Sequence, residues 1–264
     1  MNLKKNKIIV LFISLITIIP SKLSCQDNQW ENLLEDNTLK NFVRLNGDAE
    51  FKVVDGNLIG TSKLNTPNSF LATKKTYRDF ILEFEVIIDY GLNSGVQFRS
   101  ESIEEYLNGR VHGYQCEIET STRKWAGGIY DEARRGWLYP LTRNEIGQRA
   151  FRNGTWNKYR IEAIGNSIKT FVNGVETSYL IDDMTKEGFI AFQVHGISNK
   201  EEEGKKVKWR NIRILTKNLE KNLFLASNKA PQISYLDNEL TEEEKRLGFR
   251  LLFDGKTNNG WRGV

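Results

Sequence analysis

The sequence has very few cysteines and histidines, and this shortage excludes several kinds of site. Of its 264 residues, two are cysteines (Cys25 and Cys116) and two are histidines (His112 and His195). If Cys25 is lipidated or removed, the remaining thiol has no partner for an intramolecular disulfide, so the core must hold the fold. Cys116 lies in a strand pattern without a neighbouring histidine, which favours a small buried hydrophobe over a nucleophile. No HxH or HxxE spacing indicates a metal site.

Motifs that define several enzyme classes are also missing. There is no GxSxG, Walker loop or GxGxxG, which excludes the usual serine hydrolases, NTPases and dinucleotide-binding enzymes. The formal net charge is only +4, and the basic residues form no stripe, so we expect no nucleic-acid partner. Hydrophobic residues make up 39% of the chain, enough for a sizeable core.

Residues 1–24 have the pattern of a signal peptide. Three lysines precede an apolar run from Ile8 to Pro20, which is too short to span a bilayer comfortably. Leu23-Ser24-Cys25 partly matches a lipobox, although Lys22 stands where that motif has an aliphatic residue. Two outcomes stay open: an outer-membrane or cell-surface lipoprotein attached through Cys25, and ordinary cleavage with release into the periplasm. Both predict an exported protein, and only the first attaches it to a membrane, through a lipid on Cys25.

From Trp30 onward, short alternating segments separated by turns predict an all-β fold. Residues 80–88 alternate cleanly, with Phe80 and Leu82 on one face and Glu83 on the other. Asp55-Gly56 and Asn173-Gly174 are strong hairpin signals. Many evenly spaced strands without helical crossovers favour a jelly-roll sandwich of two antiparallel sheets.

The chain is predicted to contain one complete domain, over residues 25–217. The polar segment 218–245 is predicted to be a linker. Leu251–Trp261 repeats the pattern of Leu33–Phe42, in which an apolar pair precedes an acid, a threonine and an aromatic residue. We therefore expect residues 246–264 to begin a second, truncated copy; the alternative is a short terminal strand that matches by coincidence.

Three polar residues share one face of the strand over residues 113–119. If Cys116 and Ile118 face the core, Gln115, Glu117 and Glu119 point to the opposite side of the sheet. Solvent exposure is the simpler explanation for such a pattern. Glu117 and Glu119 are nonetheless candidate catalytic carboxylates, and Gln115 is a candidate substrate ligand.

The loop over residues 125–140 combines large aromatic residues, acids and arginines. Flat aromatic rings stack on the apolar face of a sugar, and charged side chains reach its hydroxyls. A structural aromatic cluster is the competing explanation. The candidate substrate-binding residues of this loop are Trp125, Tyr130, Glu132, Arg135, Trp137 and Tyr139.

His195 follows the strand over residues 189–194 and precedes Gly196. A lone histidine is more often structural than catalytic. Because strand ends border many sites, and because histidine side chains can act as general acid or base near neutral pH, His195 is also a catalytic candidate.

A series of motifs resembles the 3-keto-disaccharide hydrolase family. In chain order these are Ser94–Arg99, Gly113–Ile118, Gly127–Tyr130, Trp156–Ile161, Val172–Val175, Gly188–Gly196 and Trp209–Ile214. The resemblance implies a concanavalin-like jelly roll with a sugar on its concave sheet face. It also implies activity on glycosides oxidised at C3, with Arg99, Glu117, Glu119, Tyr130 and His195 around the sugar.

The implied reaction begins with abstraction of the C2 proton, which the C3 ketone acidifies, by either His195 or Glu117. Elimination of the C1 substituent and addition of water follow. One departure limits this assignment: relatives carry Tyr-Glu-x-Gln where this chain has Tyr114-Gln115-Cys116-Glu117, so the resemblance alone assigns no role to Glu117.

Other functions remain open at this level. A non-catalytic glycan-binding module would need the aromatic residues but not His195. A conventional glycosidase would use Glu117 with Glu119, and a structural or adhesive role at the cell surface would need no sugar. In the first two cases, as in the implied reaction, the partner is an oligosaccharide or glycoside. No cofactor is identified; a structural calcium or another divalent ion is open, although no contiguous acidic loop demands one.

Overall fold

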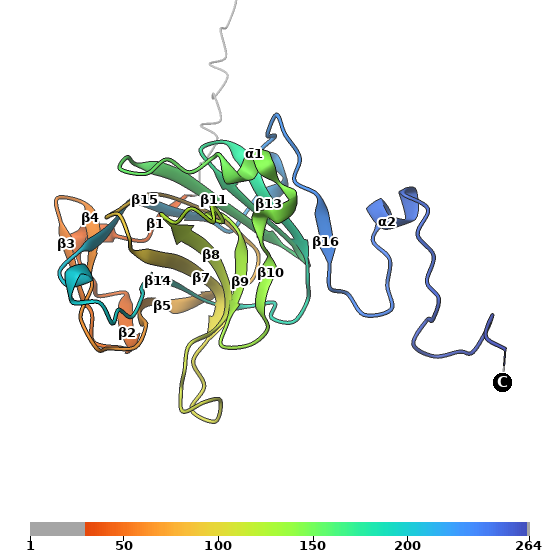
Figure 1. Ribbon diagram of the computed structural model, residues 1–264, viewed down its shortest axis with the longest axis horizontal. Helices are drawn as coiled ribbons and strands as arrows, with labels where there is room; N and C mark the ends of the chain where they lie inside the picture. Colours follow the sequence, from red (N-terminus) through yellow and green to blue (C-terminus); the bar gives the residue numbers. More distant parts are fainter. Residues whose placement is uncertain (1–29, 263–264) are drawn as a thin grey trace, which may run out of the picture.

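The computed structural model describes residues 30–262, in which two sheets pack face to face (Figure 1). The predicted signal peptide and Cys25 lie outside the described residues. One sheet has nine strands, in the order β16-β13-β12-β11-β6-β15-β4-β3 with β1 added on β15. Their bounds are β1 (Glu31–Asn32), β3 (Glu50–Val54), β4 (Asn57–Thr61), β6 (Phe80–Ile88), β11 (Asn157–Ile164), β12 (Ser167–Val172), β13 (Val175–Ile181), β15 (Lys206–Leu215) and β16 (Gln232–Ser234).

The other sheet has seven strands, in the order β10-β9-β8-β7-β14-β5-β2. Their bounds are β2 (Phe42–Asn46), β5 (Ser69–Tyr77), β7 (Asn93–Glu101), β8 (His112–Glu119), β9 (Ile129–Glu132), β10 (Gly136–Tyr139) and β14 (Gly188–Val194). Helices are short: η1 (Glu35–Asn37), η2 (Leu141–Arg143), α1 (Glu145–Gln148), η3 (Lys200–Glu202), η4 (Leu219–Asn222) and α2 (Glu242–Arg246). Apart from the parallel β13–β16 pair, the strand pairs are antiparallel, which confirms the predicted jelly-roll sandwich.

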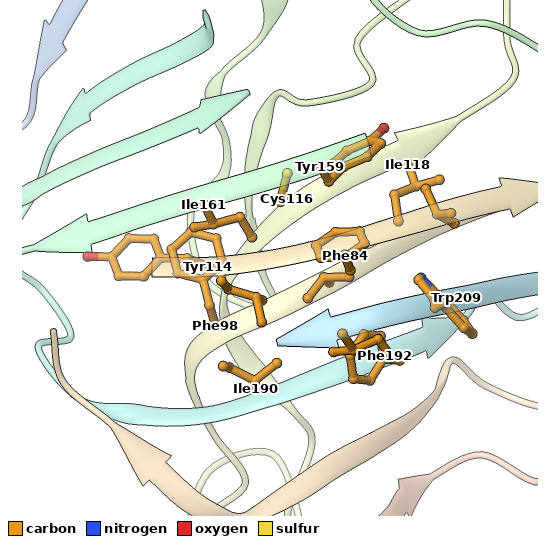
Figure 2. Close-up of a cluster of buried hydrophobic side chains, with 14 of the residues drawn as sticks. Phe84, Phe98, Tyr114, Cys116, Ile118, Tyr159, Ile161, Ile190, Phe192 and Trp209 are labelled. Carbon is orange, nitrogen blue, oxygen red and sulfur yellow. The ribbon is translucent and has the colours of Figure 1, made fainter. Parts of the chain in front are cut away.

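Aromatic and branched side chains from both sheets fill the space between them (Figure 2). Phe84 on β6 stacks on Tyr159 of β11 with ring centroids 5.1 Å apart, and Phe192 of β14 meets Phe84 edge to face. Phe98 and Tyr114 stack within the seven-stranded sheet. Because alternate residues of each strand enter this core, the remaining residues of β7, β8 and β14 point to the outer face of the seven-stranded sheet.

The outer face of the nine-stranded sheet carries a lattice of ion pairs. Glu83 accepts hydrogen bonds from Arg160 and Arg213, both at 2.6 Å. Glu85 pairs with Arg210 at 2.7 Å. The alternation predicted for β6 is confirmed, but its outward acids are bound to arginines rather than free in solvent.

The segment predicted to be a linker is partly built into the sandwich. β16 pairs in parallel with β13, and Asn228 exchanges hydrogen bonds with the backbone of Glu176. Beyond β16 the chain runs away from the sandwich through α2 (Figure 1). Among residues 30–262, no helix is both long and apolar enough to cross a membrane.

Candidate functional site

A cavity of about 440 Å³, here called the acidic cavity, opens on the outer face of the seven-stranded sheet. Most of its floor comes from β7, β8 and β14, and its walls come from β9, β10 and the adjoining loops. Its lining residues are Asn68, Asn93, Arg110, Gln115, Glu117, Arg123, Tyr130, Glu132, Trp137, Gln193 and His195. Five of the residues predicted from the sequence to bind substrate or act in catalysis therefore meet with His195 in one place.

Glu117 is a buried carboxyl group on the floor of this cavity, only 3% exposed. Asn93 and Gln115 donate side-chain hydrogen bonds to it, and Arg123 lies 3.4 Å away. Burial raises the pKa of Glu117. The three partners lower it but offset only part of the rise, so the pKa is about 7. A carboxyl group with this pKa exchanges a proton readily at neutral pH, as a general base must.

A chain of side-chain hydrogen bonds fixes the orientation of the Gln115 amide beside Glu117. Ser100 donates to the Oε1 of Gln97, whose Nε2 donates to the Oε1 of Gln115 at 2.8 Å. The Nε2 of Gln115 then donates to Glu117 at 3.0 Å. Gly95 makes room for this arrangement, because a Cβ at that position would lie 2.4 Å from the Gln115 side chain. The donors thus converge on the carboxylate and favour its charged form.

Gln193 is a cavity residue that the sequence analysis did not select. Its side chain is fully buried, and neither its Nε2 nor its Oε1 has a hydrogen-bond partner among the described residues. A buried, unpaired amide group costs about 1–3 kcal/mol. A polar residue at this cost, on the floor of a cavity, is well suited to bind a ligand oxygen.

Arg123 stands at the rim between two tryptophans. Its guanidinium lies 4.6 Å from the Trp125 ring and 4.8 Å from the Trp137 ring. Glu119 accepts from Arg123 at 2.6 Å and from the backbone N–H of Trp125. Glu119 and Trp125 do not line the acidic cavity, so the structure gives them a supporting position: they hold Arg123 and Trp137 in place.

The opposite wall combines a phenol, an acid and an imidazole. Burial raises the pKa of Tyr130, so its hydroxyl is a neutral donor. Glu132 forms an ion pair with Arg110 at 3.1 Å. The Nδ1 of exposed His195 lies 2.7 Å from the carbonyl oxygen of Gly196. Because a carbonyl oxygen only accepts, this contact assigns a proton to Nδ1 and leaves Nε2 as the ring nitrogen not used in it.

Arg99, which was predicted to contact substrate, lies outside the acidic cavity. Its side chain is buried away from the cavity and donates to the carbonyls of Arg78 and Gly165 and to Asp79. The pairing of β7 with β8 shifts register between Phe98 and Glu101, and Arg99 has φ of +46°. This bulge reverses the alternation of side chains and turns Arg99 towards the other sheet.

Tyr139, predicted together with Trp137 to bind substrate, lies outside the acidic cavity for the same physical reason. The pairing of β10 with β9 shifts between these two residues. Trp137 therefore lines the cavity, while Tyr139 is 1% exposed and donates to the carbonyl of Pro231.

Arg135 also lies outside the cavity. It pairs with Asp131 at 2.6 Å and with Asp182 at 2.7 Å, and so ties the β9–β10 turn to the end of β13. These ion pairs give Arg135 a supporting position in the fold.

Sequence signals existed for some of the residues that were missed. Gln193 interrupts an otherwise apolar strand. It lies two residues before His195, so strand alternation places both on the same side of the sheet. Asn93 and Arg123 lie at a strand start and in a turn, where alternation gives no guidance. Within residues 30–262 there is no group of three or more His, Cys, Asp or Glu side chains suited to a metal ion.

Comparison with known proteins yields one family and several related folds. A family model described as the 3-keto-alpha-glucoside-1,2-lyase-like domain matches residues 29–215. No curated protein matches the chain. The matched residues include every strand of the seven-stranded sheet and every residue that lines the acidic cavity.

Solved structures share the architecture at low sequence identity. Two presumed glycosyl hydrolases from Parabacteroides distasonis ATCC 8503 have 15% and 19% identity and TM-scores of 0.51 and 0.50. The first match covers 71% of this chain and 93% of the other; the second covers 72% and 100%. A Bacillus subtilis protein of unknown function with a galectin-like fold has 11% identity, a TM-score of 0.52 and coverage of 71% and 94%. These similarities establish the fold.

Proposed function

Because the chain belongs to the 3-keto-alpha-glucoside-1,2-lyase-like family, a family of carbohydrate-active, glycosyl hydrolase-like proteins, we propose that it cleaves glycosides carrying a ketone at C3. The acidic cavity is the proposed active site. One observation carries this proposal: a buried carboxyl group with a pKa of about 7 shares the cavity with an unpaired, buried amide. The carboxylate of Glu117 supplies the base, and the amide of Gln193 supplies hydrogen bonds to oxygen.

In the first step, the carboxylate of Glu117 takes the proton from C2 of the sugar. The C3 ketone makes this proton acidic because the electron pair left on C2 delocalises onto the ketone oxygen. Gln193 donates from Nε2 to that oxygen as negative charge develops on it. General base catalysis contributes about 10²–10⁴-fold, and a preorganised donor contributes about 10²–10³-fold.

In the second step, the electron pair forms the C1–C2 double bond and the bond from C1 to the leaving oxygen breaks. Protonated His195 gives its Nε2 proton to that oxygen, and the alcohol departs. Water then adds to C1 and gives its remaining proton to Nε2 of His195, while the Glu117 carboxyl returns a proton to C2. The net reaction converts a 3-keto-glycoside and water into a 3-keto sugar and an alcohol.

The remaining lining residues bind the sugar. Trp137 offers an aromatic edge to the ring, held by Arg123 and Trp125. Tyr130 donates from its neutral hydroxyl, and Glu132 accepts from sugar hydroxyls. These contacts fix C2 over the Glu117 carboxylate, since proton transfer requires a donor–acceptor distance within hydrogen-bond reach.

The test compares methyl 3-keto-glucoside with methyl glucoside as substrates. We expect cleavage of the keto compound only, with kcat/KM rising as Glu117 ionises through an apparent pKa of about 7. Glu117→Gln should lower kcat about 10²–10⁴-fold. Glu85→Gln, on the outer face of the other sheet, is the matched control and should keep wild-type activity. Binding of the keto sugar without turnover by the wild type would contradict the proposal and indicate a lectin-like module.

A further inference from the structure

A second cavity adjoins the acidic cavity and shares a wall with it. The two have Asn68, Arg110, Glu132 and His195 in common. The second cavity, here called the apolar cavity, measures about 660 Å³ and adds Phe70, Pro67 and Leu107 to that wall. Since His195 borders both cavities, a group protonated by its imidazole lies at the passage between them.

The floor of the apolar cavity belongs to a small hydrophobic cluster on the same sheet face as Gln193. Phe70 on β5 pairs directly with Gln193 on β14, so both side chains lie on one face. Phe70 packs there with Ala72, Val111 and Ala191. The loop from β7 to β8, which extends beyond the sandwich edge (Figure 1), contributes Leu107, 58% exposed.

The polar groups around the apolar cavity are largely occupied by other protein groups. Asn46 donates to the carbonyl of Gly109 and accepts from the N–H of Val111. Asn68 accepts from the N–H of Gly196. Arg110 and Glu132 pair with each other at 3.1 Å.

This bonding differs from that of the acidic cavity, where Gln193 has no partner for either amide atom within residues 30–262. A hydroxyl-rich ligand gains affinity from hydrogen bonds only where the site has free donors and acceptors. In the apolar cavity, the exposed residues Pro67 and Leu107 offer mainly carbon surface above the buried ring of Phe70, which favours a ligand with its own carbon surface.

Building on the proposed function, we propose that the apolar cavity is the leaving-group subsite and that it prefers an apolar aglycone to a second sugar. The preferred substrate class is therefore 3-keto-glycosides of alicyclic or aromatic alcohols. In the cleavage step, the leaving oxygen lies at the passage beside His195, and the carbon framework of the alcohol lies on Pro67 and Leu107.

Three 3-keto-glucosides test this preference, carrying methanol, cyclohexylmethanol or the 6-hydroxyl of glucose as the leaving group. All three leave as primary alcohols. We expect kcat/KM for the cyclohexylmethyl compound to exceed that for the glucosyl compound at least about tenfold. Glucose is the more acidic alcohol, so leaving-group chemistry alone predicts the opposite order.

Leu107→Ser removes part of the apolar wall at an exposed position. The ratio of kcat/KM for the cyclohexylmethyl compound to that for the methyl compound should fall about fivefold. Ile103→Ser, in the same loop but outside both cavities, is the matched control and should keep the wild-type ratio. A preference for the glucosyl compound, or an unchanged ratio in Leu107→Ser, would overturn the aglycone assignment. In either case, turnover of methyl 3-keto-glucoside would still support the proposed function. Absence of turnover with all three would overturn both.

Discussion

Replacing Glu117 by Gln should change how the stability of the protein depends on pH. The carboxyl group is buried, and its pKa rises from the usual 4.5 to about 7. At ~1.4 kcal/mol per pKa unit, this difference corresponds to about 3 kcal/mol. The amide of Gln does not titrate, so the variant lacks this pH-dependent contribution.

The sign follows from the protons that each state binds. Between pH 4.5 and about 7, folded Glu117 keeps a proton that the unfolded chain has released. The unfolded state then binds fewer protons, so the free energy of unfolding falls as pH rises through this window. Above about pH 7 the contribution is fully lost, because the folded protein holds a charged carboxylate in a poorly solvated place.

Urea unfolding at about pH 5 and about pH 8 measures this effect. Wild type should lose about 3 kcal/mol more than Glu117→Gln between the two conditions. Comparing the change with pH, rather than the absolute stability, removes any effect of the altered hydrogen bonds. Glu85→Gln serves as the control, because the pKa of Glu85 is lowered rather than raised. Burial raises this pKa, but the hydrogen bonds from Arg210 and Asn211 lower it by more. Equal pH dependence in wild type and Glu117→Gln would refute the assigned environment of Glu117.

Three further predictions concern residues with contrasting roles. Gln193→Leu should lower kcat on a 3-keto-glucoside about 10²–10³-fold. It should also raise the free energy of unfolding by about 1–3 kcal/mol, because it removes a buried amide that has no partner among the described residues. A variant that is destabilised in urea titration and active in rate assays would contradict this prediction. Arg99→Met should destabilise the protein by about 2–4 kcal/mol, since it removes three charge-assisted hydrogen bonds, with kcat unchanged; a selective loss of activity would return Arg99 to the site. Cys25→Ser should abolish incorporation of labelled fatty acid in cells if the lipobox is processed; equal absence of label in wild type would indicate ordinary cleavage.

Strand alternation predicted most of the fold because it depends on one physical rule. Alternate residues of β6 and β8, from Phe80 to Ile88 and from Tyr114 to Ile118, enter the core, and the acids between them point outward. The same rule placed Gln115 and Glu117 together on the outer face. Solvent exposure, the simpler explanation for these residues, is wrong because the walls of the acidic cavity bury both side chains.

The rule fails where a strand contains a bulge. Arg99 and Tyr139 both follow register shifts, which reverse the side of the sheet on which the next residues lie. No residue type in either segment predicts the shift. A positive φ is usually a sign of glycine, but the residue with positive φ in β7 is Arg99.

Long-range contacts could not be predicted from the sequence either. Arg123 reaches Glu117 and two tryptophans only because the turn after β8 folds back over the sheet. The β13–β16 pair joins residues about 50 positions apart, which no local pattern predicts.

In the proposed reaction, Glu117 removes the C2 proton of a 3-keto-glycoside. The most direct measurement uses methyl 3-keto-glucoside labelled with deuterium at C2, followed by mass spectrometry of the 3-keto sugar product in ordinary water. We predict a primary isotope effect on kcat and loss of the label to solvent, both tied to cleavage and both absent in Glu117→Gln above the spontaneous background. Cleavage at a normal rate with the label fully retained and no isotope effect would contradict the account and indicate direct displacement at C1.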